Sequence, residues 1–137
     1  MEILFTDQYH ETIFDPISQI HQHTAKPATV NMSEEEFKDM IKTWKETVFK
    51  ANPTYLLIDN RDLNFPISPT LQEWVMMNAG IPAMNLSSVK KLCFVIPKEL
   101  ISRLSVTQLS DDQEKIVESA EMAYFDNLES AHTWLLK

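Results

Sequence analysis

Two spacings of apolar residues alternate along the chain, and they predict alternating strands and helices. Alternating or continuous apolar runs predict six short strands, at residues 2–7, 9–14, 19–24, 55–58, 91–97 and 122–125. The runs Tyr55–Ile58 and Lys91–Pro97 hold few polar residues, so we expect these two strands to be covered on both faces of the sheet.

Apolar residues three or four positions apart predict the helices between these strands. The sequence Ser33–Glu36 is a capping box, and the apolar positions behind it predict an amphipathic helix of about five turns that ends near Asn52. A second helix is expected to begin at Ser68–Pro69 and to end at Gly80, where a C-cap favours positive φ, or one kinked turn later at Met84. Further helices are expected near Leu100–Leu104, Ser105–Ala120 (with acidic residues from Asp111 to Glu121) and Leu128–Leu135.

The resulting order is β-β-β-α-β-α-β-α-β-α, in a single α/β domain over residues 1–137. Strands that alternate with helices predict a mostly parallel central sheet, because parallel neighbours need a crossover connection. The first three strands are joined by short turns, and they therefore predict an antiparallel edge at the N-terminal end of the chain.

Composition narrows the classes of function. Gly80 is the single glycine, which excludes a P-loop, a dinucleotide fingerprint and a nucleophile elbow, since each needs several glycines. The net charge of −8 argues against binding to nucleic acid or to an anionic membrane. No apolar run is long enough to span a membrane, and the first residues lack the features of a signal peptide. We therefore expect a cytoplasmic protein with no membrane span.

Four stretches taken in order resemble a known family. They are Tyr55–Asp62, Ile67–Trp74, Val89–Pro97 and Tyr124–Leu135. Together they resemble the STAS domain (sulfate transporter and anti-sigma-factor antagonist) in its SpoIIAA-like branch, and more narrowly the small stand-alone bacterial STAS-like proteins of unassigned function. The resemblance implies a STAS-like sandwich of sheet and helices. It also implies a regulatory, non-enzymatic role in protein binding, like that of anti-sigma-factor antagonists, with no cofactor.

In the anti-sigma-factor antagonists, a strand that ends in Asp leads to a phosphorylatable Ser or Thr at the next helix start. The spacing of Asp59 and Ser68 resembles that arrangement. The family loop reads Asp-Ser/Thr-Ser/Thr-Gly, whereas this chain has Ile67-Ser68-Pro69-Thr70, so the phosphoswitch motif is degenerate. Ser68 is accordingly either a phosphoacceptor or a plain helix N-cap.

Polar residues follow the predicted central strand at its carboxyl end, where open α/β sheets bind ligands. With the following helix start they make up the candidate interaction site: Asp59, Asn60, Arg61, Asp62, Ser68 and Thr70. Arg61 can pair with an anionic ligand or a partner's carboxylate, or it can form a local ion pair with an Asp that holds the loop. Two carboxylates can also perform acid–base catalysis, but no nucleophile or anion-binding loop accompanies them.

The histidine, cysteine and methionine residues point less clearly to a functional site than the polar residues after the central strand. His21 and His23 share one face of a strand, but no Cys/His cluster completes a metal site, so we expect solvated positions on an edge strand. His10 and His132 are isolated in the sequence. Cys93, the single cysteine, lies in an apolar strand, where a thiol is buried and inert. Two further residues, Met76 and Met77, are consecutive, so we expect one of them to face a pocket or an oligomer surface.

These observations lead to three hypotheses. The first is a regulatory protein-interaction domain that binds an unidentified protein through Leu63–Val75, without catalysis. The alternative is a module that binds a small molecule or lipid, with a pocket for an apolar or anionic ligand at the carboxyl ends of strands 55–59 and 92–96. The third is an enzyme that uses Asp59 and Asp62. A homodimer is compatible with each of them, and we expect no nucleic-acid partner.

Overall fold

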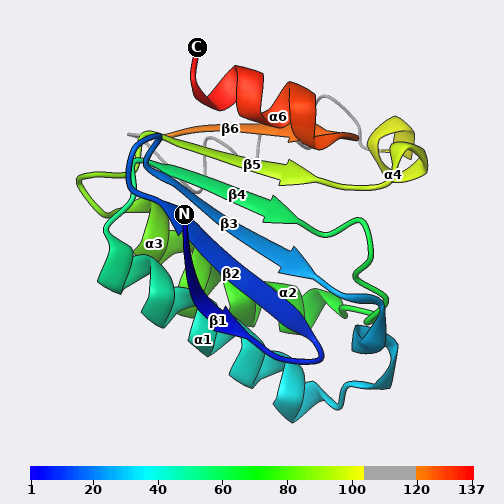
Figure 1. The fold of residues 1–137 in the computed structure, drawn as a ribbon. Coiled ribbons are helices and arrows are strands. Elements are labelled where there is room, and N and C mark those ends of the chain that lie inside the picture. The colour runs from blue at the N-terminus through cyan, green and yellow to red at the C-terminus, as the bar shows by residue number, and fades with distance from the viewer. Residues whose placement is uncertain (104–119) are drawn as a thin grey trace.

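The computed structural model describes residues 1–103 and 120–137. Its centre is one mixed six-stranded sheet whose strands lie in the same order as in the chain (Figure 1). The strands are β1 (Glu2–Thr6), β2 (His10–Asp15), β3 (Ile20–Ala25), β4 (Tyr55–Asp59), β5 (Lys91–Val95) and β6 (Glu121–Phe125). Pairs β1–β2 and β2–β3 are antiparallel, and the three remaining pairs are parallel. The predicted α/β class and the antiparallel N-terminal edge are therefore confirmed, whereas a STAS fold stays a prediction.

Helices lie on both faces of the sheet. Helices α1 (Glu34–Ala51), α2 (Pro69–Val75) and α3 (Ile81–Met84) cover one face, and α6 (Leu128–Leu135) covers the other (Figure 1). The short helices η1 (Pro27–Asn31) and α4 (Lys98–Arg103) follow β3 and β5. None of the helices in the described part of the chain is long and apolar enough to cross a membrane.

Alternating side chains of β4 and β5 build the two cores. Leu56 and Leu92 pack with Trp44 and Val48 of α1. The next residues along these strands, Leu57 and Cys93, point to the opposite face, where they pack with Ala131 and Leu135 of α6. The prediction that both strands are covered on both faces is confirmed.

The start of α1 agrees with the sequence prediction in detail. Ser33 accepts a hydrogen bond from the Glu36 backbone N–H, and the Glu36 side chain accepts one from the Ser33 backbone, so both halves of the capping box are present. The helix ends where Asn52 adopts the left-handed conformation with φ 51°, which Asn tolerates better than most residues.

The predicted C-cap at Gly80 is wrong. Gly80 has a helical φ of −60°, and the chain continues from α2 through a π-helical turn, η2 (Met76–Gly80), into α3. The wider π turn fits the position of Pro82, because a proline in a regular α-helix clashes with the carbonyl four residues before it. The alternative of a kinked extension to Met84 is the one that the structure shows.

One predicted helix lies almost wholly outside the described residues. It was expected over Ser105–Ala120, with acidic residues as far as Glu121. Glu121 is described, and it is the first residue of β6 rather than the end of a helix.

Candidate functional site

The loop after β4 is organised by an ion pair between Asp59 and Arg61. Asp59 is 4% exposed, and its Oδ1 accepts hydrogen bonds from the Arg61 backbone N–H at 3.2 Å and from Nε at 3.0 Å. Arg61 Nη2 donates to Oδ2 at 2.9 Å, which completes a two-pronged contact and raises the pKa of the Arg61 guanidinium. The structure therefore shows the local ion pair, one of the two roles expected for Arg61.

Backbone and threonine contacts fix the rest of this loop. Asn60 N–H donates to the Val95 carbonyl at 2.8 Å, which ties the loop to β5. Thr29 of η1 is fully buried, and its hydroxyl accepts from the Asn64 N–H at 3.0 Å and lies 3.4 Å from the Asp62 carbonyl. Sequence reasoning missed Thr29, because a threonine among turn residues carries no signal of a contact more than thirty residues away.

Ser68 is the N-cap of α2. Its Oγ accepts a hydrogen bond from the Leu71 N–H at 3.1 Å, and Pro69 occupies the first turn, so the N-cap role is confirmed. Ser68 and Thr70 are both exposed, together with the residues between and just before them. Phosphorylation of Ser68 stays a prediction. Within residues 1–103 and 120–137, no hydrogen bond or ion pair joins Ser68 or Thr70 to the Asp59–Arg61 pair, so the candidate site consists of two separate parts.

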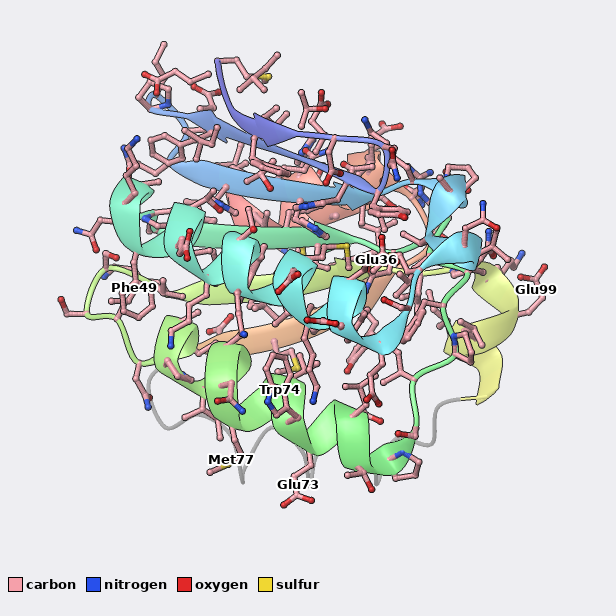
Figure 2. All side chains as sticks on the ribbon, turned by 90° about the horizontal axis from the view of Figure 1, so that it is seen from below. Glu36, Phe49, Glu73, Trp74, Met77 and Glu99 are labelled. Carbon is pink, nitrogen blue, oxygen red and sulfur yellow. The ribbon has the colours of Figure 1, made fainter. Side chains whose placement is uncertain are left out.

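Apolar side chains are exposed beside these polar residues. Ile67 is 39% exposed, Met77 is 62% exposed, and Trp74, one helical turn before Met77, is half-buried. Figure 2 shows Glu73 and Met77 pointing away from the sheet. We call Ile67, Glu73, Trp74 and Met77 the α2 surface. Met76 is only partly exposed, and the expectation that one of the two methionines faces a pocket or an oligomer surface stays a prediction.

Side chains of α1 contact the α2 surface and the loop that precedes α2. Lys38 Nζ lies 5.1 Å from the centre of the Trp74 ring, in a cation–π arrangement. Phe37 stacks on Phe65 of the loop with ring centres 4.7 Å apart. Phe37 also packs in one apolar cluster with Leu71 of α2. The loop and α2 are therefore held against α1 as one unit.

The interpretation of His21 and His23 as solvated edge positions is wrong. β3 lies between β2 and β4, and both side chains are buried on the face that α1 covers. His10 is buried beside them, with its ring centre 5.1 Å from that of His23. Within the described ranges, no group of three or more His, Cys, Asp or Glu side chains is arranged to hold a metal ion.

Cys93 is buried, as its position in an apolar run predicts. Burial raises the pKa of its thiol to about 12, because the thiolate form is disfavoured away from water. The nucleophilic thiolate is therefore almost absent at neutral pH.

Two of the hollows on the surface of the described residues involve α6. One of about 330 Å³ is lined by Phe125, Trp134 and neighbours on α6. The other, of about 200 Å³, lies between Ile13, Ile20 and Leu136. Neither includes Asp59, Asn60, Arg61 or Asp62, so neither is the pocket expected at the carboxyl ends of the central strands.

Comparison with known proteins gives no relative for this arrangement. No protein-family model matches the chain, no curated protein matches it, and no solved structure matches it.

Proposed function

We propose that this chain is a regulatory protein-interaction domain and that its partner binds the α2 surface. The observation that carries the proposal is Met77, a flexible apolar side chain that is 62% exposed one turn after Trp74. Methionine and tryptophan are enriched where proteins bind each other, because both supply large apolar contacts.

The polar groups nearby favour binding over catalysis. Both carboxylate oxygens of Asp59 accept hydrogen bonds from Arg61, and the hydroxyl of Ser68 accepts one from the helix it caps. These groups hold the loop in place, and two large apolar side chains, Ile67 and Met77, are exposed beside them among polar ones. A surface of this kind offers a partner contact area rather than a reactive group.

Charge indicates the chemistry of the partner. Glu73 is exposed beside Trp74, and the chain carries a net charge of −8. A partner with an apolar patch bordered by Lys or Arg complements this surface, because opposite charges at the rim of an interface favour association.

Photo-crosslinking in the host cell tests the proposal. A photoreactive residue at position 67 or 77 should capture the same protein, and the same residue at position 17 should not. Ile17 is the matched control, since it is 94% exposed in the turn between β2 and β3, outside the α2 surface. Met77→Glu should abolish the adduct formed from position 67 without unfolding the exposed helix. Equal capture from position 17, or an adduct that survives Met77→Glu, contradicts the proposal.

Phosphorylation of Ser68 is a separate part of the proposal, because it would place about −1.5 to −2 charges next to Ile67. Intact mass and phosphosite mapping of protein from its native cells measure it. Absence of phosphate at Ser68 in every growth condition would exclude the switch and leave the interaction itself standing.

A further inference from the structure

Three imidazole rings are enclosed between α1 and the antiparallel strands. His10 of β2 is 1% exposed, and His21 and His23 of β3 are 0% and 3% exposed. The strand register places Thr12 opposite His23, on the same face of the sheet. Histidine is rarely so deeply buried, and three buried neighbours form an unusual polar layer beneath a helix.

One of the rings is tied directly to α1. His21 Nε2 lies 2.9 Å from the Thr47 hydroxyl, and that hydroxyl donates its own hydrogen to the Trp44 carbonyl at 2.8 Å. Thr47 must therefore accept from His21, which puts the ring proton on Nε2 and leaves Nδ1 bare. Nδ1 has no hydrogen-bond partner among the described residues, and although the backbone of His21 itself favours a charged ring, burial outweighs it and lowers the pKa.

Most of the other polar side-chain atoms of the layer have no hydrogen-bond partner among the described residues. His23 has none at either ring nitrogen, and Thr12 has none at its hydroxyl. The full set of buried, unpartnered side-chain atoms in the described ranges is His10 Nδ1, Thr12 Oγ1, His21 Nδ1, both ring nitrogens of His23, and Trp44 Nε1. Uncharged rings tolerate this enclosure far better than charged ones, because burying an unpaired charge is much more costly.

The surroundings offer little to balance a positive charge. His21 and His23 stand beside Leu56 and Ile58 of β4, and α1 presents Trp44 and Thr47 to His21. Phe5 of β1 stacks on His10. These neighbouring groups are all uncharged.

Two charged groups act on the layer, both at its His10 end. The Asp7 carboxylate lies 3.9 Å from His10 Nε2, and Lys26 holds the Asp7 carbonyl at 2.6 Å. Asp7 favours a charged His10, whereas Lys26 opposes it, and burial still lowers the pKa of His10. The remaining charges near His23 would be those of His10 and His21 themselves, which repel it.

We propose that His10, His21 and His23 form a proton-sensitive latch, which holds α1 on the antiparallel strands while the rings are neutral and releases it when they become protonated. The geometry that carries this proposal is the enclosed ring cluster with its single hydrogen bond to α1. The latch stands independently of the proposed function.

The pH range of the latch follows from the burial of the rings. Burial lowers the pKa of His21 to about 4 and that of His23 to about 3, whereas an unfolded histidine has a pKa near 6.5. The folded state thus binds fewer protons than the open state below pH ~6.5. The stabilisation of the folded state by the neutral rings is fully present above that pH. As the pH falls toward 4, the equilibrium constant for folding decreases by close to tenfold per ring and pH unit.

Release of α1 would also affect α2, which packs against another side of α1. Phe37 and Met40 of α1 pack with Leu71 of α2, so α2 loses its support when α1 leaves the sheet. Acid is therefore expected to loosen α1 and α2 together, while α6 on the opposite face stays in place.

Imidazole NMR titration and hydrogen exchange of the full chain test the latch. In the folded protein, the rings of His21 and His23 should stay neutral to below pH 5. Amides of α1 should lose protection between pH 7 and 5 before amides of α6 do. Titration of His21 and His23 near pH 6.5, or equal loss of protection in both helices, would overturn the proposal.

Two substitutions and a control give an independent measurement. Lowering the pH from 6 to 5 should reduce the folding constant of the wild type about sixtyfold, since His21 and His23 contribute about eightfold each. His21→Gln, which can still donate to Thr47, and His23→Leu should each reduce this change to about eightfold. Ile3→Ala, an exposed substitution that involves no titrating group, should leave it as in the wild type, and an unchanged pH dependence in the two core variants would refute the latch. Should either core variant fail to fold, the wild-type NMR titration decides the outcome alone.

Discussion

The antiparallel and parallel halves of the sheet lie under the same layer of helices, but their buried side chains differ. In β4 and β5, the buried positions are apolar on both faces except for Asp59 at the end of β4, and Leu56 and Leu57 are the clearest apolar pair. In β2 and β3, α1 covers three histidines and a threonine. Equal burial therefore does not mean equal stabilisation, because apolar area gains free energy on leaving water whereas unpaired polar atoms lose it.

The largest effect is expected in the parallel half. Leu57→Ala removes a fully buried side chain from between β4 and α6 and should cost about 2–5 kcal/mol in the free energy of unfolding. The loss should be the same at pH 7 and pH 5, because no titrating group is involved. Urea unfolding measures it, with the exposed Ile3→Ala as control at under about 0.5 kcal/mol. If Leu57→Ala lowered the free energy of unfolding by less than about 1 kcal/mol, the parallel half of the sheet would not be the more tightly packed half.

The next effect lies at the junction of α1 with the antiparallel half. Thr47→Val keeps the shape of the side chain but removes the acceptor for His21 Nε2–H, and it should cost about 1–3 kcal/mol at pH 7. Thr47→Ser keeps the hydroxyl and should recover most of this loss. Equal stability of the valine and serine variants would mean that the His21–Thr47 hydrogen bond does not stabilise the fold.

A polar atom introduced into the parallel half should be unfavourable. Cys93→Ser places a hydroxyl in an apolar site between β4, β5 and α6, at a cost of about 1–2 kcal/mol. The wild-type thiol should also resist thiol reagents until the protein is unfolded, because burial raises its pKa to about 12. Rapid labelling of Cys93 in the native protein at pH 7 would contradict the conclusion that its thiol is buried in an apolar site.

The opposite exchange in the antiparallel half should have the smallest effect and the opposite sign. Thr12→Val replaces a buried hydroxyl that has no hydrogen-bond partner among the described residues. The change should be neutral or should stabilise the fold by up to about 1 kcal/mol. A clear loss of stability would show that the hydroxyl is satisfied in solution, most simply by an internal water molecule.

The sequence predicts the parallel half better for a physical reason. A strand formed by a continuous apolar run such as Tyr55–Ile58 is stable only when both of its faces are buried. The run His21–Thr24 is instead polar in composition, and its burial depends on Thr47 and Trp44, which come more than twenty residues later. No local pattern contains that information, so the histidines were wrongly placed in solvent.

In the candidate site too, features set by neighbouring residues are predicted from the sequence, whereas features set by the tertiary structure are not. The N-cap at Ser68 and the capping box at Ser33 depend on residues within one helical turn, and both were predicted correctly. The sequence left two roles for Arg61, and the three-dimensional path of the loop selects the one that pairs it with Asp59. Two consecutive methionines cannot both lie at the centre of one helix face, but the sequence alone does not tell which of them is exposed, and the structure exposes Met77.

The order of the strands has a consequence for how the chain assembles. Each new strand is added at the free edge of the strand before it, from β1 to β6, so no strand has to be inserted between two that are already paired. The three histidines and all of α1 belong to the first 51 residues. During synthesis this polar half can therefore form first, and it then offers an edge on which the apolar strands pair as they leave the ribosome.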